Sequence, residues 1–357
     1  MKIYIKYIVN NFIKLLLLVS FIFFILVLLL NLFEELNFFK DTNEGLYYPL
    51  LLNILNAPTI LINIFPFIFL ISAQFLIINL IDKNELILLK NFGIDNFKLI
   101  AIISLVAFVS SLIIIIFFYN FSAKLKHLYF EIKNDFATDN KYLAVITENG
   151  IWIKDEIDNN TTIINAELIE ENNLRNVVIT QFNNNFEPKK YIYGEIVDIK
   201  KNNWIIKKAI IIEKNIRTIE DNFLFETNFN SEKINTLFSN LTSLTIWELF
   251  KLKDEYNSVS YSVKEIDLHL HKIYSFPIYL TILTIFASVL MLNVPFNKPK
   301  FFYLIMGIFA SVLIFYINHF SSLLGENNKL PIILSVWLPH VIVSILTGIG
   351  MVRINEK

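Results

Sequence analysis

The sequence predicts an α-helical membrane protein with six transmembrane helices and an inserted all-β, jelly-roll-like domain. Three observations support this fold class. Hydrophobic residues make up 55% of the 357 positions, and the mean hydropathy is +0.54, above that of ordinary soluble domains. Long apolar runs form two groups of three along the chain. Between the groups lies a polar stretch, residues 122–272, that carries short β-rich runs.

The overall charge and the cysteine content exclude several classes of function. Lysine and arginine total 31, and aspartate and glutamate total 32, so the net field suggests neither a nucleic-acid partner nor a polyanionic substrate. No cysteine is present, which rules out disulfides, thiolate metal sites and cysteine nucleophiles. A domain outside the membrane must therefore be held together by packing.

Six apolar segments approach or exceed the length of about 20 residues that a bilayer crossing requires. The first follows Lys2, Lys6 and Lys14. It is too long for a signal peptide, and no small-residue cleavage site follows it. The expected spans are Leu15–Phe33, Ala57–Ile81, Leu99–Phe121, Ile273–Val294, Phe301–Leu324 and Leu330–Val352. The chain thus divides into residues 1–121 with three helices, 122–272 with the β domain, and 273–357 with three helices.

Lysine and arginine residues in the short loops predict which side of the membrane each loop faces. If the amino terminus lies inside, only Lys40 and Lys329 fall in the short loops on the opposite side. The segments that would then be cytoplasmic carry Lys2, Lys6, Lys14, Lys83, Lys90, Lys98, Lys298, Lys300, Arg353 and Lys357. We therefore expect both termini in the cytoplasm and the β domain outside.

The polar insert consists of short predicted strands separated by polar turns. The strands are expected at Tyr142–Ile146, Gly150–Ile153, Thr161–Ile164, Asn176–Phe182, Lys190–Ile199 and Trp204–Glu213. The turns include Glu148–Gly150, Asn183–Asn185 and Lys201–Asn203. This regular spacing is typical of a sandwich, a jelly roll or an open barrel. A helix is expected over Ser243–Tyr256, with Thr242 or Ser243 as its cap.

The loop near residues 82–93, between the second and third expected spans, has the pattern of a short helix. Asp82 or Asn84 could cap its start, and Gly93 suits a left-handed position after its end. One side of this helix carries Leu86, Leu89, Lys90 and Gly93. The pattern fits either an ordinary tight turn or a coupling helix that docks into a groove of a cytoplasmic motor protein.

Four stretches of the chain resemble the LptF/LptG family of lipopolysaccharide export permeases. The run NELILLKNFGI, from Asn84 to Ile94, follows a span that contains Pro66. It is similar to the family's Glu-Leu…Gly segment after a proline-bearing second helix. The other stretches are GIWIKD at 150–155, HKIYSFPI at 271–278 and LPIILSVWLP at 330–339. The last of these, with the helix at Trp247–Phe250, makes LptG the more similar member and LptF its close rival.

The resemblance implies the permease subunit of an ABC transporter in the bacterial inner membrane. Such a subunit extracts lipopolysaccharide and passes it to a periplasmic bridge. The implied partners are an LptF-like permease, an LptB-like cytoplasmic ATPase dimer, an LptA-like bridge and an LptC-like inner-membrane anchor. The chain has no GxxxxGK[S/T] phosphate loop. ATP would therefore be used on the partner, and this chain would have no catalytic residues and no bound cofactor.

Docking residues carry over from the family to the loop between the second and third spans. Glu85 is the expected ion-pair partner of an arginine on the ATPase. Leu86, Leu89 and Phe92 are expected to pack in the groove of the ATPase, and Gly93 ends the helix.

Candidate residues for the substrate path begin at the outer end of the first span. Family members often carry basic residues there, whereas this chain has Asn31, Glu34 and Glu35, with only Lys40 nearby. The acidic pair is either solvated charge at the level of the lipid headgroups or a site for a divalent cation that bridges to phosphate.

Two polar residues late in the fifth span, Asn318 and His319, are further candidates, because polar groups inside a membrane usually face protein or a water-filled cavity. The five histidines lack the convergent spacing of a zinc site, so no metal is expected. The resemblance also implies that the first and fifth spans line openings to a cavity shared with a similar partner. The β domain would then receive the acyl chains.

Two other functional classes fit the sequence less well. A membrane-tethered sensor would use the β insert to detect a ligand, but it would normally carry a cytoplasmic output domain. A membrane enzyme that acts on lipid-linked sugars would need clustered acidic, histidine or arginine residues at one membrane face, and the sequence shows no such cluster. An LptF-type subunit and a permease for another lipid fit the same pattern.

Overall fold

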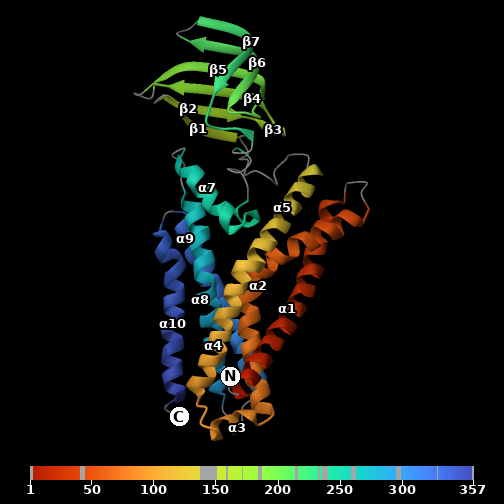
Figure 1. Ribbon diagram of the computed structural model, residues 1–357, viewed down its shortest axis with the longest axis vertical. Coiled ribbons are helices and arrows are strands. Elements are labelled where there is room, and N and C mark those ends of the chain that lie inside the picture. The colour runs from red at the N-terminus through yellow and green to blue at the C-terminus, as the bar shows by residue number, and fades with distance from the viewer. Residues whose placement is uncertain are drawn as a thin grey trace. The chain divides into compact units, whose positions relative to one another are not determined.

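Long membrane helices and one antiparallel sheet form the described part of the chain (Figure 1). The computed structural model describes residues 3–40, 45–136, 151–157, 160–170, 172–183, 187–213, 216–231, 234, 240–258, 263–294, 299–327 and 329–355. Two compact units can be distinguished: the membrane unit, residues 1–126 and 264–357, and the β unit, residues 127–263. The predicted strand Tyr142–Ile146 and the turn Glu148–Gly150 lie outside the described residues.

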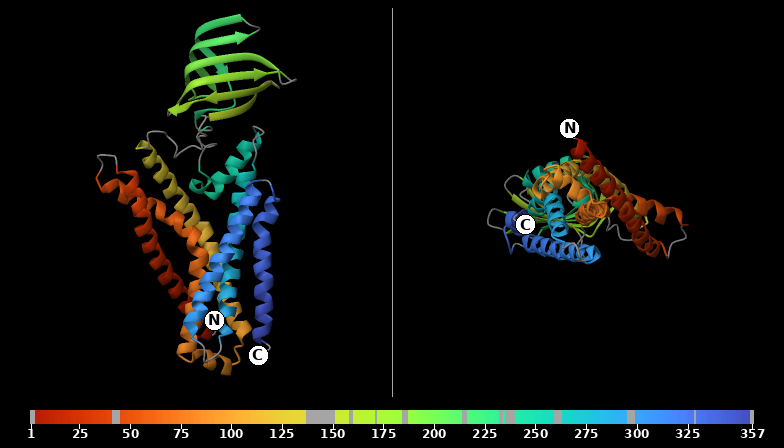
Figure 2. Two further views of the ribbon diagram at one scale, coloured as in Figure 1. Left: turned by 180° about the vertical axis from the view of Figure 1, so that it is seen from behind. Right: turned by 90° about the horizontal axis from the view of Figure 1, so that it is seen from below.

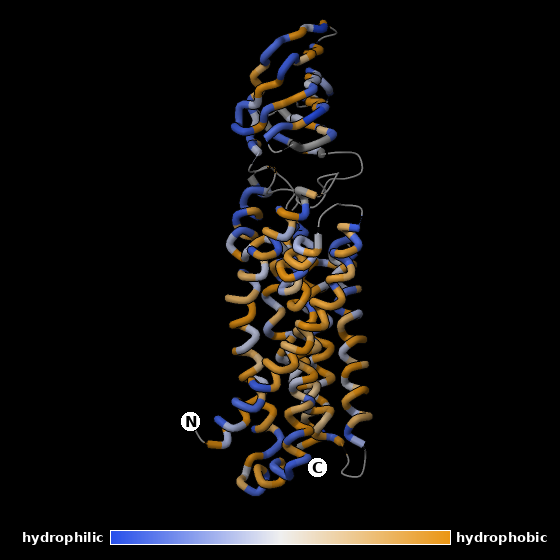
Figure 3. The backbone as a smooth tube through the Cα atoms, turned by 90° about the vertical axis from the view of Figure 1, so that its right-hand side faces the viewer, coloured by the Kyte–Doolittle hydropathy of each residue, from blue (hydrophilic) through white to orange (hydrophobic). Residues whose placement is uncertain are grey.

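Six helices in the described ranges are long and apolar enough to cross a bilayer, which confirms the six predicted spans. They are α1 (Ile3–Phe38), α2 (Tyr47–Asp82), the continuous helix of α4 (Asn96–Ile113), η1 (Ile114–Tyr119) and α5 (Asn120–Asp135), α8 (Lys264–Leu292), α9 (Lys300–Glu326) and α10 (Ile332–Asn355). Hydrophobic residues follow these helices along most of their length (Figure 3). Each helix also continues past its expected apolar run into more polar sequence.

The second membrane helix, α2, is the most buried helix of the membrane unit. Within its apolar stretch 61% of the residues are buried, against 17% in α1 and 11% in α9. It packs against α1, α8 and α9. Small residues allow close approach between membrane helices, and Gly307 of α9 lies so near Gln74 of α2 that a β-carbon there would stand 2.1 Å from the Gln74 amide nitrogen. α1 and α9 are therefore peripheral helices with long exposed apolar faces.

The third membrane helix is interrupted by a π-helical stretch, η1. Such stretches are rare and are frequent at functional sites. Its last residue, Tyr119, is buried, and the Tyr119 hydroxyl lies 2.9 Å from Nε2 of His269 on α8. This contact links the third and fourth membrane helices.

The ends of several membrane helices meet around the short helix α3 (Glu85–Asn91) (Figures 1 and 2). Asn96 at the start of α4 donates to the carbonyl of Ile354 at the end of α10, at 3.4 Å. Asp82 forms an ion pair with Lys300 at the start of α9. The start of α1, the start of α9 and the end of α10 therefore lie at the same end of the membrane unit, which we call the α3 end.

The β unit contains an antiparallel sheet whose strands follow the order β1-β2-β4-β5-β6-β7, with β3 paired to β4. The strands are β1 (Ile151–Ile157), β2 (Asn160–Ala166), β3 (Leu168–Glu170), β4 (Asn173–Phe182), β5 (Pro188–Asp198), β6 (Asn203–Glu213) and β7 (Ile216–Glu226). The predicted β character of the insert is confirmed. The sequence had not predicted β3 and β7, and the described strands form a meander in one sheet.

One face of this sheet is apolar and is covered by the chain that follows β7. Along β6 the buried residues include Trp204 and Ile206, with exposed neighbours between them, as expected of a strand with one buried face. Phe229 and Ile234, downstream of β7, pack in the same core. The Trp204 indole donates to the carbonyl of Phe229 at 2.8 Å, so the covering segment is held by a hydrogen bond as well as by apolar contact.

A buried carboxylate joins the two edges of the sheet. Asp155 on β1 is fully buried. Its oxygens accept hydrogen bonds from the Thr227 hydroxyl at 2.5 Å, the Asn228 backbone amide at 3.0 Å and the Asn228 side chain at 2.8 Å. Thr227 and Asn228 directly follow β7, the strand at the opposite edge. The sheet is therefore curved, and Asp155 fastens its first strand to the end of its last.

The helix before the fourth membrane helix, α7 (Ile246–Ser258), starts later than predicted. The Thr245 hydroxyl accepts from the Glu248 amide at 3.4 Å, and the Glu248 carboxylate accepts from the Thr245 amide at 2.7 Å. This reciprocal pair is a capping box. The expected cap at Thr242 or Ser243 is therefore wrong, because those residues belong to the preceding 3₁₀ turn, η2 (Leu241–Ser243).

Candidate functional site

The short helix α3 ends as its sequence predicts and begins differently. Gly93 has a φ of +78°. The Gly93 amide donates to the carbonyl of Lys90 at 2.9 Å, and the Ile94 amide donates to that of Leu89 at 3.1 Å. These two bonds define a Schellman motif, whose left-handed residue is usually glycine. At the start, Asn84 makes no side-chain cap and has a φ of +57°, so the expected capping by Asp82 or Asn84 is wrong.

The two faces of α3 differ sharply in exposure. Leu89 is only 9% exposed and belongs to the core of the membrane unit, and Leu86 packs against that core. On the other side, Ile87 and Leu88 are more than half exposed, and Phe92 is 83% exposed. We call these three exposed residues, Ile87, Leu88 and Phe92, the apolar patch of α3. Of the predicted packing residues, Leu89 is buried, Leu86 is half-buried and Phe92 is exposed.

Glu85 joins α3 to the first membrane helix. Its carboxylate accepts a hydrogen bond of 2.7 Å from the hydroxyl of Tyr7 on α1. A carboxylate has about four lone-pair sites, so Glu85 can accept this bond and still meet a cation from outside. The Tyr7 contact fixes its side chain beside the apolar patch of α3.

Asn31 lies in a buried network of amides that joins α1, α2 and α5. Its side-chain nitrogen donates to Asn53 at 2.9 Å, and its side-chain oxygen accepts from Asn56 at 3.0 Å. Asn53 also donates to the carbonyl of Leu28 at 2.9 Å. The ammonium of Lys126 on α5 donates to the Asn56 oxygen at 2.6 Å. In an apolar environment these bonds hold the three helices together. Asn31 is therefore buried between helices and is not exposed to a substrate.

The acidic pair near the outer end of α1 is divided between two sides of the helix. Glu34 is exposed, and Glu35 is fully buried. Lys40, just after α1, is exposed. Within the described ranges no three histidine, cysteine or acidic side chains are grouped in a way that could hold a metal ion.

Asn318 and His319 line a cavity of about 420 Å³ inside the membrane unit. Helices α2, α8, α9 and α10 form its walls. Asn31 does not line this cavity, so the structure does not bring together the substrate-path residues predicted in α1 and α9.

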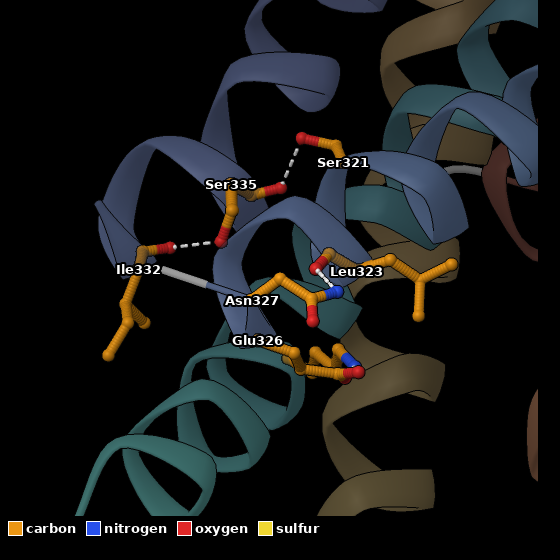
Figure 4. Close-up of polar contacts among 7 residues, drawn as sticks. Ser321, Leu323, Glu326, Asn327, Ile332 and Ser335 are labelled. Carbon is orange, nitrogen blue, oxygen red and sulfur yellow. Dashed lines mark hydrogen bonds and ion pairs between the residues drawn. The ribbon is translucent and has the colours of Figure 1, made fainter. Parts of the chain in front are cut away.

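The turn from α9 to α10 is secured by hydrogen bonds between side chains and carbonyls (Figure 4). Pro339 has no amide hydrogen, so the carbonyl of Ser335 lacks its usual helical donor. The Ser321 hydroxyl of α9 donates to that carbonyl at 2.7 Å. A β-carbon on Gly325 would stand 2.3 Å from the Ser335 hydroxyl oxygen. The two helices are thus in very close contact where α10 begins.

Sequence reasoning missed Asn53, Asn56 and Lys126, although these residues hold Asn31 in place. Asn53 and Asn56 are three positions apart near the start of α2 and so lie on one helical face. That spacing was a usable signal for a polar contact with a neighbouring helix.

The chain is similar to one known protein family over most of its length. A family model described as the lipopolysaccharide export system permease LptF/LptG matches residues 6–353. No curated protein matches the sequence. The family match runs through both groups of membrane helices and through the β unit between them.

Proposed function

We propose that this chain, which belongs to the LptF/LptG family of lipopolysaccharide export permeases, is the LptG-type subunit of an ABC transporter. It would extract lipopolysaccharide from the bacterial inner membrane and pass it to a periplasmic bridge. The observation that carries the proposal is the family match from residue 6 to residue 353, since it includes the helices and the β unit together.

The apolar patch of α3 is the proposed docking site for a cytoplasmic, LptB-like ATPase dimer. Exposed apolar residues on a helix are the anchors by which a helix packs into a groove. Ile87, Leu88 and Phe92 supply such anchors, while Leu89 holds the helix to the core. Glu85 would meet a cation of the ATPase beside them. The chain has no phosphate loop of its own, so ATP is used on that partner.

The proposed orientation places the α3 end in the cytoplasm and the β unit in the periplasm. Lys83, Lys90, Lys98, Lys300 and Arg353 belong to the segments that meet at the α3 end. An excess of lysine and arginine in short loops marks the cytoplasmic side of a membrane protein. The short loop between α1 and α2, at the other end of these helices, has far fewer basic residues.

Cysteine labelling tests this orientation cleanly because the chain has no native cysteine. Lys201→Cys, in the exposed turn between β5 and β6, should react with a membrane-impermeant maleimide in intact spheroplasts. Asn91→Cys, exposed at the end of α3, should react only after the cells are permeabilised. The opposite labelling pattern would refute the orientation.

The substrate would enter between this chain and an LptF-like permease with the same helix arrangement. The cavity of about 420 Å³ in the membrane unit is too small for a lipid with several acyl chains. The apolar stretches of α1 and α9 have the smallest share of buried residues among the six helices, and an exposed apolar face is open to lipid or to another subunit. We therefore assign α1 and α9 to the openings of a shared cavity. An LptC-like anchor and an LptA-like bridge would receive the substrate from the β unit.

Photo-crosslinking tests the assignment of α1 and α9. A crosslinker at Leu30 of α1 or Phe320 of α9, both more than 60% exposed, should capture lipopolysaccharide in living cells. A crosslinker at Ile196 of β5 should capture it only when ATP is available. Leu346 of α10, which is also exposed, serves as the control and should capture phospholipid alone. If Leu30 and Phe320 behave like Leu346 while export continues, the assignment is wrong.

A further inference from the structure

Polar side chains connect the segment around α3 to two membrane helices, α1 and α9. Glu85, the first residue of α3, accepts a hydrogen bond of 2.7 Å from the hydroxyl of Tyr7 on α1. Asp82, the last residue of α2, forms an ion pair with Lys300, the first residue of α9. Asp82 and Glu85 are three positions apart in the sequence. One short segment therefore holds the starts of two different helices.

The helices that these contacts reach are held by little burial within the membrane unit. In the apolar stretches of α1 and α9, 17% and 11% of the residues are buried, against 61% in α2. Elements with few buried apolar contacts move more readily than well-packed ones. Polar contacts at the α3 end therefore affect the positions of α1 and α9 more than they affect the position of α2.

The Asp82–Lys300 pair has the charge placement of a contact between helices. The peptide dipoles of a helix disfavour an anion at its end and a cation at its start. Asp82 lies at the end of α2 and Lys300 at the start of α9, so each charge is unfavourable for its own helix. Across the contact the signs are favourable, because Asp82 meets the positive start of α9 and Lys300 meets the negative end of α2.

Both contacts lie at the surface of the protein. Tyr7 is 38% exposed, and the side chains of Lys300 and Asp82 are 31% and 53% exposed. Exposed ion pairs contribute little to folding stability, because water and salt screen their attraction. Stabilisation of the fold is therefore a weak explanation for these contacts. They are suited to holding one arrangement of helices and to breaking when the arrangement changes.

We propose that the Tyr7–Glu85 and Asp82–Lys300 contacts carry the movement of the bound ATPase to α1 and α9. Tyr7 and Lys300 are positioning residues, because they act through the segment on which the ATPase docks. When the ATPase displaces α3, Tyr7 draws the start of α1 with it and Lys300 draws the start of α9. Each of these helices is continuous along its length. A rigid helix passes a displacement at one end to the other end.

The inference rests on the proposed function, because it requires an ATPase on α3 and openings beside α1 and α9. It adds the side chains that connect the docking site to those openings. If the unchanged permease neither binds an ATPase nor moves lipopolysaccharide, the proposed function fails and the inference fails with it. If the transporter works equally well without the two contacts, only the inference fails.

The complete complex of permease and ATPase in proteoliposomes tests the inference, with rough-type lipopolysaccharide as the probe. Two quantities are measured: the rate of ATP hydrolysis, and the lipopolysaccharide captured by a crosslinker at Ile196 of the β unit. Their quotient is the lipopolysaccharide delivered per ATP hydrolysed. Lys300→Gln and Tyr7→Phe should each lower this quotient about two- to fivefold, the shift that an exposed polar contact can support. Because hydrolysis occurs on the partner, it should continue in both variants.

Two matched variants control for loss of charge and loss of a hydroxyl. Lys98→Gln removes an exposed lysine whose ion pair, with Asp95, lies within one segment, so no contact between helices is lost. Tyr4→Phe removes the hydroxyl of a half-buried tyrosine one turn before Tyr7. Both proteins should deliver as much lipopolysaccharide per ATP as the unchanged permease.

Charge exchange tests whether the ion pair itself is the connection. Asp82→Lys and Lys300→Asp each place like charges side by side, and each should lower the quotient at least as far as Lys300→Gln. The double variant Asp82→Lys/Lys300→Asp restores an opposite pair without changing the total charge, so it should recover most of the delivery. The inference is overturned if the double variant stays as impaired as the single ones. It is also overturned if Lys300→Gln and Tyr7→Phe deliver lipopolysaccharide as Lys98→Gln and Tyr4→Phe do.

Discussion

Replacing Phe92 with aspartate is expected to remove most of the ATPase that co-purifies with this permease. Phe92 is the most exposed member of the apolar patch of α3. A buried aromatic anchor at an interface commonly contributes 2 kcal/mol or more to binding, so the amount of bound ATPase should fall by about tenfold or more. The measurement is the ratio of ATPase to permease after affinity purification from membranes.

Two further variants separate loss of docking from loss of folding. Leu46→Asp also places a charge on an exposed apolar residue, but in the loop before α2, so it should leave the ATPase ratio unchanged. Leu89→Asp should reduce the yield of the permease itself, because Leu89 belongs to the core. An unchanged ATPase ratio in the Phe92→Asp protein would exclude the apolar patch of α3 as the docking site.

Replacing Asp155 with alanine should open the curved sheet of the β unit. The change leaves the Thr227 hydroxyl, the Asn228 amide and the Asn228 side chain without the acceptor that they share. We expect a loss of about 3 kcal/mol of local stability, since several buried donors become unsatisfied together. Hydrogen exchange of the β1 and β7 amides in the full-length chain measures this opening, and it should become roughly 100-fold faster.

Asp221→Ala is the control for Asp155→Ala. Asp221 is exposed on β7, so its removal changes the charge of the β unit equally and breaks no buried contact. Its exchange rates should match those of the unchanged protein. If the Asp155→Ala protein also exchanges at the unchanged rate, the carboxylate does not fasten the two edges of the sheet.

The membrane helices could be predicted from the sequence because their apolar runs have the length that a bilayer requires. Their true ends could not. α2 begins at Tyr47 and α5 continues to Asp135, because helical hydrogen bonding carries on into polar sequence that hydropathy does not count. β7 was missed for a related reason. Most residues of β7 are exposed on both faces of the strand. Because no face has to be apolar, its sequence does not alternate between polar and apolar side chains.

The candidate site was predictable where one residue decides the local backbone. Gly93 was expected to be left-handed and is, since that conformation suits glycine. The seven residues of α3 do not show which face points outward, because packing against distant helices decides the orientation. In the structure Leu89 lies inward and Phe92 lies outward. In the same way, the burial of Asn31 depends on Asn53 and Asn56 of another helix.

The contact between Ser321 and Ser335 bears on how the chain enters the membrane during synthesis. An unpaired carbonyl in the hydrocarbon core costs several kcal/mol. α10 carries such a carbonyl at Ser335, opposite Pro339, and its donor comes from α9. If α10 inserted alone, its unpaired carbonyl would raise the free energy of insertion. Insertion beside α9 removes this cost, because α9 supplies the missing donor. The last two helices are thus expected to leave the insertion machinery as a paired hairpin, with α9 waiting at its exit until α10 has been made.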